Sequence, residues 1–144
     1  MTNKTKLLPL IPALWASVFD IFITTVYQPK EYWQGNLSIA NEGNPIGALF
    51  MKHHVSGLFV ISGIWLILIV LLGYHLPRKF SRVFLLFALI AHSFGASTWL
   101  SMHLGFTSTM FFILLNSILY LAVDEYVRKN EEVDHYRANI NVTE

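Results

Sequence analysis

Between residues 43 and 123 the chain contains no aspartate or glutamate, and its only basic residues there are Lys52, Arg78, Lys79 and Arg82. The whole chain is 54% hydrophobic and 13% charged, whereas a typical soluble domain has about 25% charged residues. Long apolar segments with so few charges are typical of helices that cross a lipid bilayer. The sequence therefore predicts an integral membrane protein whose main partner is lipid.

Four apolar segments are long enough to cross a bilayer, which takes about 20 helical residues. Their hydrophobicity is continuous, whereas the strands of a membrane barrel alternate between apolar and polar residues. We predict an all-α, four-helix membrane bundle formed by residues 1–127, followed by a polar cytoplasmic tail at 128–144. The expected spans are 7–28, 53–76, 80–102 and 104–123, with a long outer loop at 29–52.

The positions of lysine and arginine predict how the bundle is oriented. Cytoplasmic loops of membrane proteins are enriched in these two residues. Only Lys30 and Lys52 fall on one side of the predicted bundle. The other eight basic residues fall on the opposite side: Lys4, Lys6, Arg78, Lys79, Arg82, Arg128, Lys129 and Arg137. We therefore expect both termini to be cytoplasmic.

Charge balance and cysteine content exclude several classes of function. A formal net charge of +1 gives no basic field for nucleic acid. The absence of cysteine excludes disulfides and thiolate metal sites. The sequence contains no HExxH zinc motif and no GxSxG nucleophile motif. Whether the protein is an enzyme stays open at this point.

The loop sequence Glu42-Gly43-Asn44-Pro45 predicts the start of a helix. Asn44 suits the N-cap, Pro45 suits the first helical position, and Glu42 lies near the positive end of the helix dipole. A continuous helix from Pro45 to Leu76 would be longer than the bilayer core, so it either tilts or lies partly in the interface before turning inward. That choice decides the depth of His53 and His54.

Asp20 is the one acidic residue inside a predicted span. An ionisable group in this position costs about 2.5–3.5 kcal/mol on insertion scales and marks a candidate functional site. Small and hydroxyl residues share its helix face and indicate contact with another helix: Ala13, Ala16, Ser17, Thr24 and Tyr27. Asp20 is therefore expected to face the bundle.

Polar residues on the other spans are expected at a similar depth. His92 shares a face with Ala88, Gly95, Ala96, Trp99 and His103, which again mixes small and polar residues. His53 and His54 point about 100° apart on a helix, so at most one of them faces the same cavity. Asn116 lies mid-way along the fourth span, where a hydrogen-bonding contact between helices is favoured over a chemical role.

These residues predict one polar site in the outer half of the bundle. The candidate ligand-binding residues are Asp20, Glu42, Asn44, His92 and Asn116, and the candidate metal ligands are Asp20, His53, His54, His92 and His103. Carboxylate and imidazole donors suit divalent metals, and a His/acid pair can also move protons. A buried histidine or aspartate can instead be a hydrogen-bonded packing residue.

Three functional hypotheses follow. The first is a membrane protein with an outward-opening polar site that binds a metal ion or a small ligand. The second is a non-catalytic accessory subunit, packed against a larger membrane partner or against copies of itself. The third is a b-haem electron carrier, which rests only on the placement of histidines.

The residues Asp20, Thr24-Thr25, Tyr32-Trp33 and Asn41-Glu42-Gly43-Asn44-Pro45, followed by His92-Ser93-Phe94-Gly95-Ala96, form a recognisable order. Over about residues 14–103 the chain resembles the uncharacterised DUF5658-type membrane proteins of bacteria and archaea. The resemblance implies a small multi-span protein of a prokaryotic inner membrane. It implies no activity.

Overall fold

The computed structural model describes residues 6–140, with side chains described through residue 133. All elements in this range are helical. Three helices are long and apolar enough to cross a membrane: α2 (Leu10–Tyr27), α5 (Gly57–His75) and α6 (Arg78–Ile140). Three short helices connect α2 to α5: α3 (Lys30–Trp33), the 3-10 helix η1 (Leu37–Ile39) and α4 (Pro45–Met51). The prediction of an all-helical protein with membrane-length helices is confirmed.

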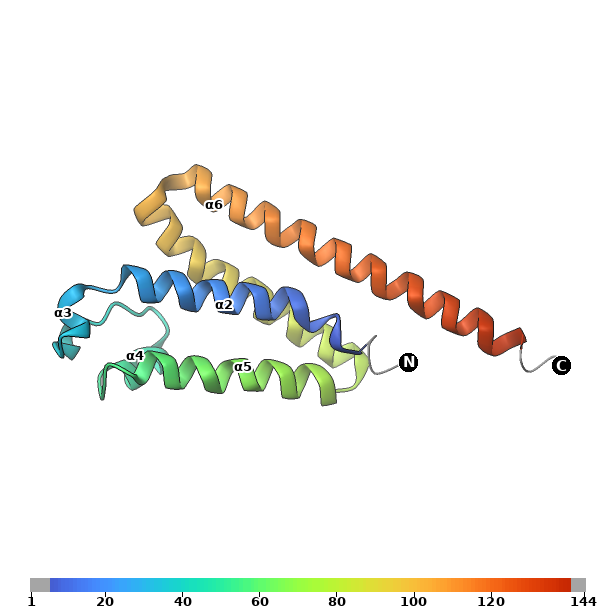
Figure 1. The fold of residues 1–144 in the computed structure, drawn as a ribbon, viewed down its shortest axis with the longest axis horizontal. Coiled ribbons are helices and arrows are strands. Elements are labelled where there is room, and N and C mark those ends of the chain that lie inside the picture. Colours follow the sequence, from blue (N-terminus) through green and yellow to red (C-terminus); the bar gives the residue numbers. More distant parts are fainter. Residues whose placement is uncertain (1–5, 141–144) are drawn as a thin grey trace.

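Helix α6 bends sharply at Gly105, where φ is 82° and ψ is 173°. Glycine adopts a positive φ without the steric cost that a Cβ would bring. The two arms of α6 run in opposite directions (Figure 1), and ion pairs from Arg78 to Glu131 and from Arg82 to Asp124 link them. The predicted third and fourth spans thus lie on the two helical arms of α6, which are separated by the non-helical backbone of Gly105.

The second arm of α6 also extends further than expected. Its helix passes the predicted end of the fourth span at 123 and continues through most of the predicted tail to Ile140. The boundary at 127 and 128 therefore coincides with a change in composition and not with a change in secondary structure. Residues 141–144 of the predicted tail lie outside the described residues.

The predicted segment from Pro45 to Leu76 is broken into α4 and α5. Asn44 caps α4, since its side-chain oxygen accepts a hydrogen bond from the backbone N–H of Ile46 at 3.0 Å. The chain then turns and starts α5 at Gly57, which lies directly against the backbone of Phe50. A side chain at position 57 would collide with that backbone, so glycine permits the close approach of the two helices.

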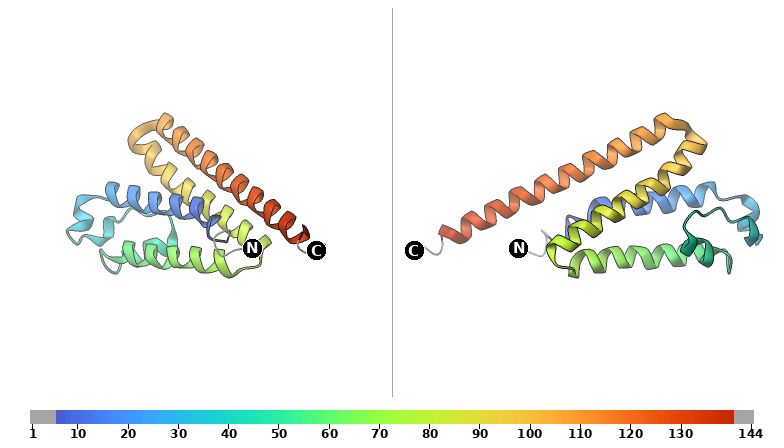
Figure 2. Two further views of the ribbon diagram at one scale, coloured as in Figure 1. Left: turned by 45° about the vertical axis from the view of Figure 1, so that its right-hand side comes forward. Right: turned by 180° about the vertical axis from the view of Figure 1, so that it is seen from behind.

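α2, α5 and the first arm of α6 pack against one another (Figures 1 and 2). The predicted inward face of α2 is confirmed, because Ala13, Ala16 and Ser17 are all buried. On α6, Ala88 and Ala96 are fully buried at the same contact. Small residues allow helices to approach closely in membranes, where packing and hydrogen bonds replace the hydrophobic effect.

The outer faces of the long helices are also apolar. Phe22 on α2 is 59% exposed, and Phe94 and Phe111 on the two arms of α6 are 72% and 67% exposed. Exposed apolar surface on this scale requires a partner other than water. α2, α5 and α6 are long and apolar enough for that partner to be the lipid of a membrane.

The helix ends and the connecting segments gather at two opposite ends of the helix array (Figure 1). The start of α2, the connection from α5 to α6 and the end of α6 lie at one end. The short helices α3, η1 and α4 lie at the opposite end, as does the bend at Gly105. At that end Tyr32 is fully buried, and its hydroxyl donates a hydrogen bond to the carbonyl of Val55 at 3.1 Å. This bond fixes α3 against the turn between α4 and α5.

Candidate functional site

A hydrogen-bonded pair joins α2 to α6 inside the bundle. Nδ1 of His92 lies 2.8 Å from Oδ2 of Asp20, and the two side chains are 17% and 20% exposed. Asp20 is about 10 Å from the end of α2 at 1.5 Å per residue. Because an ionised carboxylate only accepts hydrogen bonds, Nδ1 is the donor when Asp20 is charged. Nε2 of His92 is then the nitrogen that can accept a proton, or a hydrogen bond from a donor group of a ligand.

Gly95 makes room for the carboxylate. A Cβ at this position would lie 2.8 Å from Oδ1 and 2.9 Å from Oδ2 of Asp20. Real Cβ atoms are almost never that close to another heavy atom, so the carboxylate sits directly on the helix surface that glycine leaves open. Gly95 follows His92 by one helical turn, and both residues therefore face α2.

Trp65 on α5 forms another wall of the pair. Its ring lies 5.9 Å from the ring of His92, with an interplanar angle of 52°. The indole Nε1 is buried and has no hydrogen-bond partner among the described residues. Buried donors in proteins are normally paired with protein groups or ordered water. α5 therefore contributes an aromatic wall and one unsatisfied donor to this part of the bundle.

Glu42 reaches the same region from the loop between η1 and α4. Its Oε1 accepts a hydrogen bond from the backbone N–H of Asn44 at 2.7 Å, and its side chain packs on Gly47 of α4. Burial raises the pKa of Glu42, and the nearby charge of Asp20 raises it further. Backbone hydrogen bonds from Asn44 and Gly43 and the charge of His92 lower the pKa in part. Glu42 is thus within electrostatic reach of both members of the pair.

Gln28 holds the loop segment that carries Glu42. The buried side chain of Gln28 accepts a hydrogen bond from the backbone N–H of Asn41 at 3.0 Å and donates one to the carbonyl of the same residue. This two-point attachment joins the end of α2 to the residue that precedes Glu42. It fixes the loop in the position where the charge of Asp20 raises the pKa of Glu42.

His103 lies in an aromatic stack and not on the pair. Its ring stacks on Tyr27 with centroids 3.9 Å apart and an interplanar angle of 7°. Trp99 continues the stack, with its ring 5.8 Å from that of His103. The stack joins the end of α2 to the first arm of α6, close to the bend at Gly105.

The predicted places of His53 and His54 need correction. Both were expected near the start of a span with one facing the cavity, but both are exposed in the turn between α4 and α5. His54 forms a local hydrogen bond, with its Nδ1 2.8 Å from Oγ of Ser56. The physical reason is the break after α4, which delays the start of α5 to Gly57.

The five predicted metal ligands are therefore not gathered in one place. Only Asp20 and His92 bond to each other. Among the described residues, no group of three or more histidine, cysteine, aspartate or glutamate side chains is close enough to hold a metal ion. The site is thus an acid–imidazole pair, with Glu42 as a second carboxylate within electrostatic reach.

Asn44 and Asn116 have their polar atoms engaged elsewhere. The side chain of Asn44 caps α4. Asn116 is buried, accepts a hydrogen bond from Nε1 of Trp15 at 3.0 Å and donates one to Oγ of Ser93 at 2.8 Å. It joins α2 to both arms of α6, as expected for an interhelical polar contact.

Gln28, Gly95 and Trp65 complete the surroundings of the pair, and none of them was among the predicted site residues. The role of Gly95 could have been predicted from the sequence, because Gly95 lies one turn from His92 on the same helix face. No sequence pattern predicts the roles of Gln28 and Trp65, since these roles depend on how the loop and α5 fold back onto α2 and α6.

In comparisons with known proteins, no protein-family model matches the chain, and neither a curated protein nor a solved structure matches it. The functional inference therefore rests on the residues themselves.

Proposed function

We propose that this chain is a multi-pass membrane protein that binds a small, positively charged ligand at the Asp20–His92 pair. The 2.8 Å contact between these two side chains carries the proposal. A carboxylate and an imidazole are costly to place between apolar helices, and such groups are usually kept in membranes for function.

The charge of the site favours a cation. Asp20 and Glu42 supply two carboxylates, and His92 is the one basic group that acts on both. With both acids ionised, the site keeps a net negative charge, whichever protonation state His92 adopts. A small cation that donates hydrogen bonds would pair with Asp20 and Glu42, while Nε2 of His92 accepts a hydrogen bond or a proton. A proton is the smallest cation of this class.

In the proposed topology, the protein lies in a prokaryotic inner membrane and the ligand reaches the site from the outer side. Lys6, Arg78, Arg82 and Arg128 gather where the start of α2, the end of α5 and both arms of α6 meet. Figure 1 shows this end of the helix array opposite to α3 and α4. The positive-inside rule assigns that end to the cytoplasm. With α2, α5 and the two arms of α6 as four spans, Glu42 and the bend at Gly105 then face outside.

A metal ion is the second candidate ligand because Asp20, Glu42 and His92 offer oxygen and nitrogen donors. The absence of a three-donor cluster among the described residues gives a metal less support than an organic cation or a proton. The haem hypothesis has less support still. His53 and His54 lie in an exposed turn, and His103 stacks on Tyr27.

The proposal is tested by thermal unfolding of the detergent-purified protein with added methylammonium or Zn²⁺. A ligand that binds the folded state raises its stability in proportion to the logarithm of ligand concentration above Kd. We expect the unfolding temperature of the wild type to rise with the logarithm of methylammonium concentration. The effect should disappear in Asp20→Asn and in His92→Ala.

His53→Ala is the matched control because it removes an exposed histidine at the same end of the molecule. It should keep the full response to methylammonium. An equal response in Asp20→Asn and in the wild type would contradict the proposal. A response to Zn²⁺ alone that depends on Asp20 would replace the organic cation with a metal ion.

A further inference from the structure

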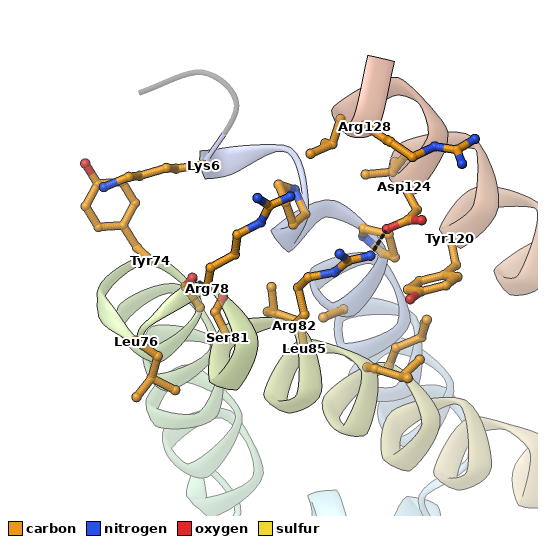
Figure 3. Close-up of a pocket in the computed structure, with 18 of the residues that line it drawn as sticks. Lys6, Tyr74, Leu76, Arg78, Ser81, Arg82, Leu85, Tyr120, Asp124 and Arg128 are labelled. Carbon is orange, nitrogen blue, oxygen red and sulfur yellow. Dashed lines mark hydrogen bonds and ion pairs between the residues drawn. The ribbon is translucent and has the colours of Figure 1, made fainter. Parts of the chain in front are cut away.

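A cavity of about 330 Å³ (Figure 3) is lined by neither Asp20 nor His92. It is formed where the start of α2, the end of α5 and both arms of α6 meet. The site proposed above uses none of its residues. The cavity is therefore a second feature with its own chemistry.

Basic side chains outnumber acidic ones around this cavity. Lys6, Arg78, Arg82 and Arg128 line it, together with two acids, Asp124 and Glu131. Both acids are already engaged, since Asp124 pairs with Arg82 and Glu131 pairs with Arg78. Lys6 and Arg128 have no acidic partner among the described residues, and Nζ of Lys6 lies 5.5 Å from the ring centre of Tyr74. The cavity thus carries an excess of positive charge.

The inner walls of the cavity are apolar. Leu85, Leu86 and Leu89 of α6 line one side, and Pro12 and Ala13 of α2 line another. Next to the cavity, the outer face of α6 is also apolar, with Val83 64% exposed and Phe87 58% exposed. Figure 3 shows Arg78 and Arg82 on the same helix as Leu85, so charged and apolar lining residues are adjacent. A ligand that fits both parts has an anionic head and an apolar body.

We propose that this cavity binds the phosphate head of an anionic phospholipid, whose acyl chains lie along α6. Lysine and arginine between membrane helices are the groups that recognise lipid phosphates. The lipid phosphate would lie near Lys6, Arg78 and Arg128, and its apolar part near the leucines of α6. The proposed topology places this end at the cytoplasmic leaflet, although the cavity itself does not depend on the function of Asp20 and His92.

The test measures lipid binding to the full-length protein by native mass spectrometry and by thermal unfolding in mixed micelles. The probes are phosphatidylglycerol, phosphatidylcholine and inorganic phosphate. The double variant Lys6→Gln/Arg128→Gln removes two positive charges and leaves both ion pairs of the cavity intact. Lys30→Gln/Lys52→Gln removes the same charge at the other end and is the control.

We expect phosphatidylglycerol to bind and stabilise the wild type and the control, and to bind the Lys6→Gln/Arg128→Gln variant roughly thirtyfold more weakly. Phosphatidylcholine and inorganic phosphate should bind far more weakly than phosphatidylglycerol. Equal loss in both double variants would overturn the proposal, because it would show attraction by overall charge. Binding of inorganic phosphate as tight as that of the lipid would also overturn it, in favour of a free anion.

Discussion

Nδ1 of His92 lies 2.8 Å from Oδ2 of Asp20, although the two residues are 72 positions apart and belong to different helices. The contact depends on three features of the sequence. Small residues on α2 allow the helices to approach, Gly95 leaves space for the carboxylate, and both polar residues lie on the inward faces of their helices. Each feature can be changed separately.

Gly95→Ala should displace the carboxylate of Asp20. The new methyl group would lie within 2.8–2.9 Å of both carboxylate oxygens, so one helix or the side chain must move. Overpacking of this kind costs about 1–3 kcal/mol. We expect a lower unfolding temperature in detergent and loss of the response to methylammonium.

Gly63→Ala on α5 is the matched control, because a Cβ at that position would meet no atom within 4 Å. Alanine has a higher helix propensity than glycine, so this variant should be as stable as the wild type or more stable. If both variants behaved alike, the proposed role of Gly95 would be wrong.

Glu42→Gln should change how stability depends on pH. Because the folded state raises the pKa of Glu42 above its ordinary value of 4.5, the folded protein holds this proton more tightly than the unfolded chain. The contribution of Glu42 to the stability of the wild type therefore falls as pH rises from 4.5 through the raised pKa. Glutamine removes that penalty and keeps an oxygen for the N–H of Asn44. Across this range, the unfolding temperature of the variant should rise relative to that of the wild type as pH rises.

Glu125→Gln removes one exposed negative charge from α6 and controls for net charge. The difference between the two variants isolates the environment of Glu42. A wild type that gained stability relative to Glu42→Gln with rising pH would contradict the electrostatic assignment.

Gln28→Ala should release the loop that carries Glu42. The substitution removes both hydrogen bonds to the backbone of Asn41, at a cost of about 1 kcal/mol. Amide hydrogen exchange should rise at Asn41 and its neighbours, while exchange in α5 stays unchanged. Gln34→Ala, at an exposed glutamine of the same loop, should leave exchange at Asn41 as it is. Unchanged exchange in Gln28→Ala would exclude the attachment.

The proposed topology can be mapped with single cysteines, since the natural chain has none. An impermeant maleimide should label Ser38→Cys and Thr107→Cys on intact cells, and Lys79→Cys only after permeabilisation. Labelling at 107 together with protection of 79 requires that the first arm of α6 crosses the membrane. Labelling of position 79 on intact cells would reverse the orientation, and protection of position 107 would contradict the four-span arrangement.

The sequence was informative where local rules decide the structure. Helix periodicity placed Asp20 and His92 on inward faces, and capping chemistry identified Asn44 and Pro45 as the start of α4. In both cases the deciding interactions lie within a few turns of one helix. The suggestion that Asn116 joins helices was also correct.

Features that depend on packing between segments could not be predicted in the same way. The break after α4 depends on the close contact of Gly57 with Phe50, and this break moved His53 and His54 away from the bundle. Trp65 reaches His92 only because α5 folds back beside α6. Periodicity on one helix gives no information about the partner that covers it.

The ¹⁵N spectrum of histidine-labelled protein in micelles, compared between the wild type and Asp20→Asn, reports whether Asp20 and His92 form one ligand site. When neutral, His92 of the wild type should carry its proton on Nδ1, and its Nε2 signal should shift when methylammonium is added. In Asp20→Asn the preference for Nδ1 should weaken and the shift should disappear. A His92 signal with the proton on Nε2, unchanged by the variant and by methylammonium, would contradict the claim that the two residues form one ligand site.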